Sequence, residues 1–396
     1  MNNLERFIRY VKIDTQSDDT TGTTPSTEKQ KNLGLLLVNE LINLGLKDAH
    51  MDEWGNVYAH LKGKGSKIGL NAHMDTALEV TGANVKPHLI KNYNGGIIKL
   101  ENGLKMSPKE FPGLAKHIDH DLVVTDGNTL LGADDKAGIA IIMSALQYYH
   151  EHPWEPHSNI SVCFTVDEEI GEGPLHFDYQ EMDAKYAYTI DGSDINKIEN
   201  ENFNAWSAHI KVKGVAIHPG EGKGKLINAI LVMNELLAKL PENETPFGAN
   251  EDEGFYHITN LSGNSEEIEA NIILRDFKEK GMHKKLDKIE RICKEAKEKY
   301  PQCSIEFTTK KQYENMKPYV DKKPIAIKRA REAFRKNGIE PVFGAIRGGT
   351  DGATFSKNGL PTPNLGTGSY NHHGRYEYLD VQEYEKMIKI VIDLVK

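Results

Sequence analysis

Three apolar segments of this sequence each end in a group of acidic or histidine residues. They are "KIGLNAHMDT" (67–76), "ISVCFTVDEE" (160–169) and "YAYTIDGSD" (186–194), and helical patterns alternate with strand patterns along this half of the chain. Buried strands separated by helices favour a mostly parallel sheet, whose binding sites lie beyond the carboxyl ends of its strands. We therefore predict an α/β fold, with helices flanking the sheet and a site made by the residues that follow these strands.

The pattern changes near residue 207, which indicates a second domain. With 396 residues, the chain is too long for one ordinary domain. From 207 onward the order is strand, helix, strand, strand, charged helix over 278–300, and strand, which is the βαββαβ order of a ferredoxin-like unit. We predict an inserted ferredoxin-like domain over 207–313, and a larger domain formed by residues 1–206 and 314–396.

Several local features are predicted within the larger domain. Helices are expected near residues 4–11, 28–44 and 324–337 and from 381 onward. Ser26 or Thr27 is the expected N-cap of the second helix, which Gly45 ends. The segment 83–121 is a long connection, and connections of that length are uncommon unless they are functional or partly structured.

Composition excludes several classes of protein. The net charge is -9, from 49 basic and 58 acidic residues, which argues against a nucleic-acid or membrane-surface role. The three cysteines have no disulfide or zinc-finger spacing, and the amino-terminal segment is charged and amphipathic, unlike a signal peptide. No window approaches the ~18 apolar residues of a membrane span. We expect a soluble cytoplasmic protein that acts on small molecules.

A His–Asp pair and an Asp–Asp pair suggest metal binding. In the strand that ends at "AHMDT", His73 and Asp75 face the same side, so that the carboxylate can orient an imidazole whose other nitrogen binds a metal. In "LLGADDKAGIA", Gly132 and Gly138 flank Asp134 and Asp135. These glycines permit the close packing in which Asp134 bridges two cations while Asp135 caps the helix or forms hydrogen bonds. A simple His–Asp pair and a plain helix cap are the alternatives.

Three further segments supply acids and histidines. Glu168 and Glu169 point in opposite directions in extended chain, so one can bind metal while the other faces substrate as a general base. Asp191 and one of the adjacent histidines His372 and His373 offer additional ligands. Each residue taken alone has an ordinary surface or turn role as its alternative. Together they make a mixed nitrogen and oxygen site suited to two zinc ions.

Seven ordered motifs resemble those of the two-zinc metallopeptidases that include the aminoacylases and glutamate carboxypeptidases. The motifs span nearly the whole chain and are most similar to those of the aminotripeptidases in that family. The resemblance implies a zinc-peptidase-like catalytic domain with an inserted lid. The motifs are "NAHMDT", "LLGADDKAGIA", "FTVDEEIG", "YTIDG", "GVAIHPG", "RGGTDGA" and "YNHHGRYE".

The resemblance also implies roles for individual residues. One zinc ion would be held by His73, Asp134 and Asp191, and Asp134 would bridge to a second held by Glu169 and His373. Glu168 would be the general base, Asp75 would orient His73, and the Asp134–Asp135 peptide bond would be cis. His373 is preferred to His372 because it directly precedes the glycine and lies four residues before Glu377. Cobalt or manganese are alternatives to zinc.

The substrate-binding residues are likewise implied by the resemblance. His218 of the lid would stabilise the oxyanion, in some family members from a partner subunit, so a homodimer is a further implication. Arg275 and Arg347 resemble groups that bind the carboxylate and backbone of a peptide, for which a guanidinium is suited. The expected activity is release of the amino-terminal residue of a tripeptide. The alternatives are a dipeptidase, deacylase or carboxypeptidase of the same family, or a non-catalytic peptide-binding protein.

Overall fold

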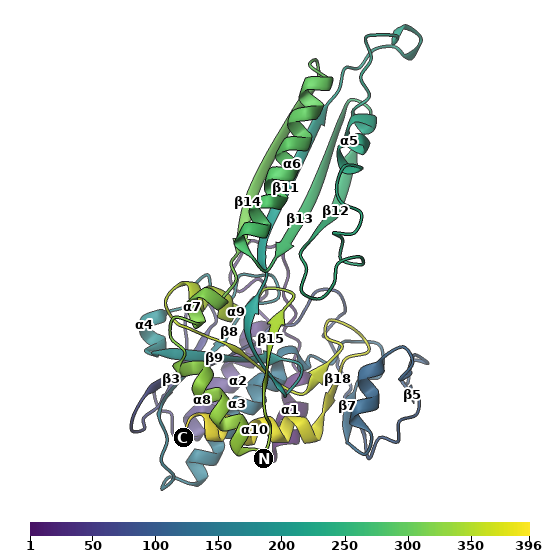
Figure 1. Ribbon diagram of the computed structural model, residues 1–396. Helices are drawn as coiled ribbons and strands as arrows, with labels where there is room; N and C mark the ends of the chain where they lie inside the picture. The colour runs from purple at the N-terminus through teal and green to yellow at the C-terminus, as the bar shows by residue number, and fades with distance from the viewer. The chain divides into compact units, whose positions relative to one another are not determined.

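A computed structural model describes residues 1–396, and the chain divides into two compact units (Figure 1). The first unit contains residues 1–200, 316–344 and 350–396, and the second contains 201–315 and 345–349. The segment 207–313, for which we predict a separate domain, falls inside the second unit.

The first unit is built on an eight-stranded sheet whose centre is parallel. Strands β8, β3, β9 and β16 run parallel to one another, whereas the β1–β2, β2–β8 and β16–β10 pairs are antiparallel. The predicted α/β fold with a mostly parallel sheet is confirmed, with antiparallel strands added towards the edges. In sheet order the strands are β1 (His50–Met51), β2 (Val57–Leu61), β8 (Asn159–Thr165), β3 (Lys67–His73), β9 (Tyr186–Gly192), β16 (Asn364–Gly366), β10 (Lys197–Asn202) and β15 (Val342–Ile346).

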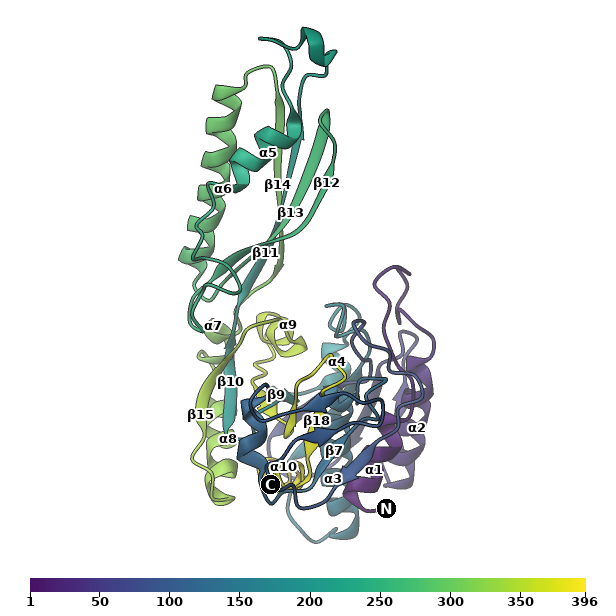
Figure 2. The same cartoon turned by 90° about the vertical axis from the view of Figure 1, so that its right-hand side faces the viewer.

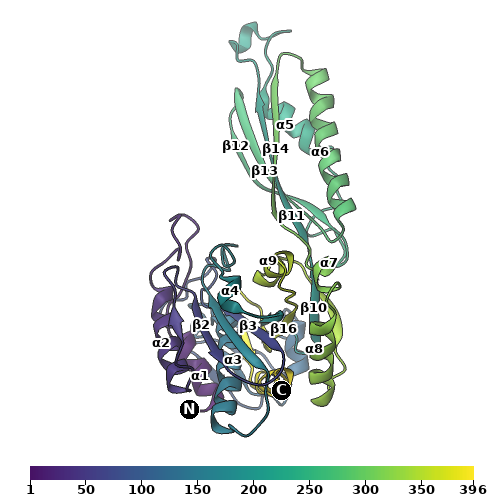
Figure 3. The same cartoon turned by 90° about the vertical axis from the view of Figure 1, so that its left-hand side faces the viewer.

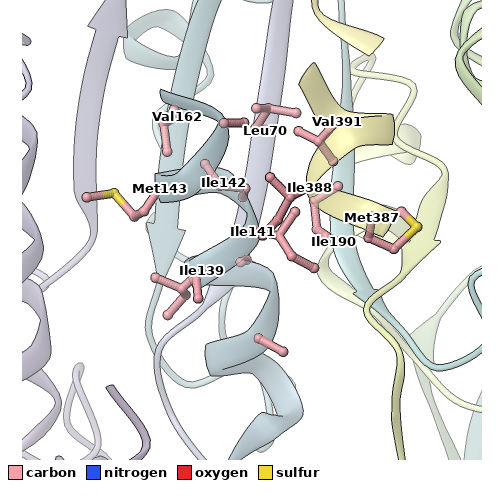
Figure 4. Close-up of a cluster of buried hydrophobic side chains, with 14 of the residues drawn as sticks. Leu70, Ile139, Ile141, Ile142, Met143, Val162, Ile190, Met387, Ile388 and Val391 are labelled. Atoms are coloured by element: carbon pink, nitrogen blue, oxygen red, sulfur yellow. The ribbon is translucent and has the colours of Figure 1, made fainter. Parts of the chain in front are cut away.

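Alternating side chains place two apolar clusters on opposite faces of this sheet. Val162 and Phe164 of β8 join the main core, while Cys163 between them joins a smaller cluster. Figure 4 shows part of the main core, where Ile141 of α3 lies close to Ile190 of β9 and Ile388 of α10. The helices around the main core are α1 (Asn3–Val11), α2 (Gln30–Asn43), α3 (Ala133–Glu151), α8 (Ile325–Lys336) and α10 (Val381–Leu394), and the shorter ones are α4 (Tyr179–Met182), α7 (Lys317–Val320) and α9 (Asp351–Lys357).

The predicted N-cap of α2 is wrong. The helix begins at Gln30, and Lys29 is its N-cap residue, without a capping side-chain hydrogen bond. The Ser26 hydroxyl instead donates to Asp167 at 2.5 Å, and the backbone N–H of Ser26 donates to the same carboxylate at 2.7 Å. The Ser26 hydroxyl therefore hydrogen-bonds to the buried Asp167 carboxylate, which is distant in the sequence, and does not cap the helix.

The long connection over 83–121 is partly structured. It contributes β4 to a four-stranded antiparallel sheet and adds a small hairpin, a 3-10 helix and a third apolar cluster that includes Leu114 and Tyr378. Its elements and their partners are β4 (His88–Ile90), β5 (Ile98–Lys99), β6 (Lys105–Met106), η1 (Pro112–His117), β7 (Leu122–Val124), β17 (Ser369–Tyr370) and β18 (Tyr378–Asp380).

The second unit has the predicted βαββαβ order. Its four strands form an antiparallel sheet in the order β12–β13–β11–β14, and α5 and α6 cover one face of it (Figures 2 and 3). The ferredoxin-like prediction is confirmed. The elements are β11 (Asn204–Lys213), η2 (Pro219–Glu221), α5 (Ala229–Leu237), β12 (Phe255–Gly263), β13 (Glu267–Asp276), α6 (Glu279–Lys299) and β14 (Ser304–Tyr313).

Two further observations concern membrane-spanning helices and cysteines. None of the helices combines the length and apolar character needed to cross a bilayer. The cysteines Cys163, Cys293 and Cys303 are all buried and free.

Candidate metal centre

Two groups of potential metal ligands in the first unit share Asp134. The first contains His73, Asp134 and Asp191, whose ligand atoms all lie within 4.8 Å of one another. Nε2 of His73 lies 3.0 Å from Oδ1 of Asp134 and 3.4 Å from Oδ1 of Asp191. One imidazole nitrogen therefore faces two carboxylate oxygens.

The second group contains Asp134, Glu169 and His373. Nε2 of His373 lies 3.0 Å from Oε2 of Glu169 and 3.4 Å from Oδ2 of Asp134. The two oxygens of Asp134 thus face different groups, Oδ1 the first and Oδ2 the second. This is the arrangement in which one carboxylate can bridge two cations.

The sheet places these side chains at the ends of neighbouring strands. His73 is the last residue of β3, and Asp191 lies near the end of β9, which pairs in parallel with β3. Glu169 follows β8, the other parallel neighbour of β3, and Asp134 lies at the start of α3. The acids that follow apolar strands in the sequence therefore meet at one edge of the sheet.

Asp75 is buried and contacts several parts of the site. Its Oδ1 lies 3.2 Å from Nδ1 of His73, and that nitrogen has no aligned hydrogen-bond partner. The same carboxylate accepts hydrogen bonds from the backbone N–H groups of Glu168 at 3.0 Å and Glu169 at 3.1 Å. Asp75 thus lies beside the imidazole and also holds the segment that carries the two glutamates.

The turn that carries Asp134 is fixed by two other carboxylates. The Asp134–Asp135 peptide bond is cis, as the family resemblance implies. Asp135 accepts hydrogen bonds from the backbone N–H groups of His73 at 3.2 Å and Gly138 at 3.1 Å, so it does form the predicted hydrogen bonds at the helix start. Buried Glu377 accepts three more, from the backbone N–H groups of Leu131, Gly132 and Asp134.

Both adjacent histidines lie near Asp134, but only one contacts Glu169. Nδ1 of His372 lies 3.1 Å from Oδ2 of Asp134, and its Nε2 lies 2.8 Å from the Ser369 hydroxyl. His373 belongs to the second ligand group and has a left-handed backbone with φ of 61°. Such a conformation is uncommon for a residue other than glycine, and it often marks a functional position.

The electrostatics of the site favour bound cations. Burial, followed by the nearby Asp134 carboxylate, raises the pKa of Glu169 to about 7 and that of Asp191 to about 6. Oε1 of Glu169 is also buried without a hydrogen-bond partner. Burying several carboxylates together is costly unless positive charge compensates them. The donor set of histidine nitrogen and carboxylate oxygen fits divalent zinc.

Glu168 is outside both ligand groups but interacts electrostatically with their members. Burial raises its pKa well above the usual range, His73 opposes this rise, and the carboxylates of Asp191 and Asp351 add to it. Asp351 is itself a buried carboxylate that accepts a hydrogen bond from the Thr165 hydroxyl at 2.7 Å. A partly exposed glutamate with a raised pKa beside potential metal ligands is a candidate for a general base.

The three predicted substrate-binding residues belong to the second unit. Arg275 of β13 donates through Nη1 to Gln312 at 3.1 Å and to the carbonyl oxygen of Leu274 at 3.0 Å. Nη1 of Arg347 donates to the carbonyl oxygens of residues 250 and 251. His218 is exposed and accepts a hydrogen bond from the backbone N–H of Gly220 at 3.2 Å.

Three supporting carboxylates were not predicted as site residues. Asp167 holds the start of the Glu168–Glu169 segment through Ser26 and Gln30, Glu377 holds the Asp134 turn, and Asp351 lies near Glu168. All three stand inside motifs that were recognised, "FTVDEEIG", "YNHHGRYE" and "RGGTDGA". Their presence inside these motifs is the sequence feature from which the three supporting carboxylates could be predicted.

Fold and site define a class of enzyme. Residues 118–396 match peptidase family M20/M25/M40, so the chain belongs to that family and is a peptidase, a hydrolase. The family resemblance of the seven motifs is confirmed.

Individual relatives are similar over nearly the whole chain. Peptidase T of Clostridium perfringens strain 13 is 44% identical over 396 residues, which cover 99% of this chain and 98% of that protein. A solved tripeptidase of Staphylococcus aureus has a TM-score of 0.80 at 22% identity, with 100% and 97% of the two chains covered. A Bacillus subtilis M20 peptidase described as dinuclear metal-binding has a TM-score of 0.66 at 14% identity, with 99% and 96% covered. At these identities, the two structures show a shared fold.

Proposed function

We propose that this chain is a metallo-aminopeptidase that releases the amino-terminal residue of tripeptides. The observation that carries the proposal is the pair of ligand groups that share Asp134, in a chain of the M20 family. The similarity to peptidase T supports the choice within that family. The description of one structural relative as a tripeptidase agrees with it.

The two ligand groups would hold two zinc ions. His73, Asp134 and Asp191 would bind one ion, and Asp134, Glu169 and His373 the other, with cobalt or manganese as alternatives. Bound zinc supplies Lewis acidity, which lowers the pKa of a water molecule and polarises a peptide carbonyl. Asp75 would fix the orientation of His73 through Nδ1.

Glu168 would move the proton during hydrolysis. Its carboxylate takes a proton from the attacking water as the water oxygen bonds to the peptide carbonyl carbon. When the carbon–nitrogen bond breaks, Glu168 donates that proton to the leaving amine. Burial raises the pKa of this carboxyl group, so it holds a proton more strongly than an exposed glutamate would. The backbone hydrogen bond from Glu168 to Asp75 holds the segment in place.

Residues of the second unit would select the substrate. Arg275 and Arg347 form these hydrogen bonds through Nη1, and a guanidinium has further N–H donors for a peptide carboxylate or carbonyl. His218 would stabilise the oxyanion, from the same chain or from the partner in a homodimer. If an arginine binds the carboxylate at a set distance from the metal ligands, only peptides of one length present their first bond for cleavage.

A panel of peptides of different lengths tests this proposal. Di-, tri- and tetrapeptides of one composition, an amino-blocked tripeptide and an N-acyl amino acid are compared by kcat/KM. We expect cleavage of the free tripeptide to exceed the others at least about 100-fold, as expected where binding of both peptide ends is needed. Equal cleavage of all lengths, or activity confined to N-acyl amino acids, would contradict a tripeptidase. Binding of peptides without any cleavage would favour the non-catalytic alternative.

A further inference from the structure

A third cluster of potential metal ligands lies in the first unit, outside the site around Asp134. It contains His117 at the end of η1, His120 three residues later and Asp380 at the end of β18. Nδ1 of His117 lies 2.7 Å from Oδ2 of Asp380, and Nδ1 of His120 lies 2.6 Å from the same oxygen. The two histidine nitrogens therefore converge on one carboxylate oxygen.

His117 is buried without an aligned hydrogen bond. Its side chain is 1% exposed, and both Nδ1 and Nε2 lack a hydrogen-bond partner, although Nδ1 is close to Asp380. His120, in contrast, does form its hydrogen bond with Asp380. Buried polar atoms almost always have a partner, so an unpaired one calls for an explanation such as a bound ion. Nδ1 faces the shared oxygen at 2.7 Å but is not aligned for a hydrogen bond with it.

The surroundings hold Asp380 in place for such a role. Its Oδ1 accepts a hydrogen bond from the backbone N–H of Glu383 at 2.9 Å, which caps α10 and leaves Oδ2 directed at the histidines. Glu383 accepts a hydrogen bond from the Tyr370 hydroxyl at 2.6 Å, and its other oxygen lies 3.9 Å from Nδ1 of His117. Ligands that are themselves hydrogen-bonded are typical of metal sites.

We propose that His117, His120 and Asp380 bind a divalent cation of the zinc type, in addition to the ions of the candidate metal centre. Two imidazole nitrogens and a carboxylate oxygen form a donor set that zinc accepts, with ligands about 2.0–2.2 Å from the ion. Ligands at this distance from a tetrahedral ion lie roughly 3.4 Å from one another, so Oδ2 would move away from the two nitrogens by less than about 1 Å to admit the ion. Glu383 or a water molecule supplies the fourth ligand.

The ion would link the long connection over 83–121 to the carboxyl-terminal helix α10. His117 and His120 belong to the segment 83–121, whereas Asp380 is the N-cap residue of α10. His120 is 34% exposed, which leaves a path for the ion from solvent. None of the three residues is among those to which we assign catalysis or substrate binding. The ion's role is therefore structural, and this inference does not depend on the proposed peptidase mechanism.

The inference is tested by comparing the zinc content of purified wild-type protein with that of two variants. Wild type, His120→Gln and the control His60→Gln are dialysed against zinc buffered at one free concentration, and bound zinc per chain is measured by mass spectrometry. His60 forms a comparable pair with Asp48 at 2.9 Å but belongs to no three-residue ligand group. We expect His120→Gln to lose about one equivalent of zinc, as expected for removal of one site, while His60→Gln loses none. Equal zinc content in all three proteins would overturn the inference.

A second measurement covers the case in which His120→Gln does not fold. Crystals of the zinc-loaded wild type are examined by anomalous scattering on both sides of the zinc absorption edge. We expect a zinc peak between the two histidines and Asp380, independent of any peak near Asp134. If zinc is present at the other ligand groups or in excess in the crystal but gives no peak here, the inference is overturned. The three residues would then form only histidine–carboxylate ion pairs. Tripeptide cleavage by His120→Gln is expected within about twofold of wild type, because the site is structural.

Discussion

At the scale of single residues, Asp75 connects the proposed metal ligands to the proposed base. It lies beside His73 and accepts the backbone N–H groups of Glu168 and Glu169, so one buried carboxylate fixes an imidazole and two glutamates. Loss of its negative charge would weaken the orientation of His73 and remove an acceptor from a buried segment. Outer carboxylates of this kind are commonly worth a factor of about 10–100 in metal affinity.

We therefore predict that Asp75→Asn binds zinc about 10–100-fold more weakly than wild type, since the amide lacks the charge that supports His73. The measurement is retention of zinc and of activity across a series of chelator-buffered zinc concentrations. Asp48→Asn is the matched control, because it alters an exposed carboxylate that contacts another histidine, His60. Zinc retention by Asp75→Asn equal to that of the control would contradict a supporting role for Asp75.

Residue types and spacing predicted which residues form the site better than they predicted the hydrogen bonds that support it. His73, Asp134 and Asp191 stand at strand or helix ends that the apolar pattern reveals, and the structure brings them together. The prediction of Ser26 as a helix N-cap is wrong, because its hydroxyl bonds to Asp167, which lies 141 residues away in the sequence. Local sequence contains no information on such a contact unless both segments are already placed in the fold.

At the scale of elements, Gly138 sets how closely α3 approaches β9. A Cβ atom at this position would lie 1.9 Å from the carbonyl oxygen of Ile190 and 2.4 Å from Oδ1 of Asp135. The carbonyl belongs to the strand that carries Asp191, so a side chain here would push apart two elements that carry proposed metal ligands. The close packing predicted from the flanking glycines is present.

Gly138→Ala is accordingly predicted to destabilise the protein by about 1–3 kcal/mol, the usual cost of overpacking, despite alanine's higher helix propensity. The measurement is the thermal unfolding temperature, followed by zinc content. Gly34→Ala in α2 is the control, since the new Cβ would meet the flexible Met51 side chain at 2.9 Å. The control should change stability by less than about 1 kcal/mol, because helix propensity offsets the contact. A similar effect at both positions would contradict the packing argument.

Element types and the parallel centre of the sheet were predictable where the apolar pattern was long, but the antiparallel pairs towards the edges were not. The parallel centre follows from buried strands whose side chains on both faces are apolar, as in β8. The antiparallel edge pairs of β2 and β10 arise from the positions of their connections, which leave no mark in the strand sequence. The ferredoxin-like unit was predictable because six consecutive elements follow a known order.

At the scale of the whole molecule, the second unit has a core of its own. Its apolar cluster contains only residues between 206 and 307, and its four strands pair only with one another. Arg347, from the short segment 345–349, adds contacts over the rings of Phe203 and Phe255 at 5.3 and 6.0 Å. Such cation–π contacts contribute about 0.5–2 kcal/mol, which is small beside a buried core.

Residues 201–315 are therefore predicted to fold when expressed alone, because a domain with its own core is an independent folding unit. The measurement is circular dichroism during heating, together with the dispersion of amide signals in an NMR spectrum. A cooperative transition and dispersed signals are expected. A spectrum of unfolded chain would show that this unit needs the rest of the protein to fold.

The most direct test of the central claim is turnover of a tripeptide by Glu168→Gln, with zinc measured in the same sample. Glutamine keeps the size of the side chain but cannot accept the proton, and Glu168 is outside both ligand groups. The account predicts the zinc content of wild type and a kcat lower by about 10²–10⁴-fold, the usual contribution of a general base. Unchanged turnover with zinc still bound would contradict it.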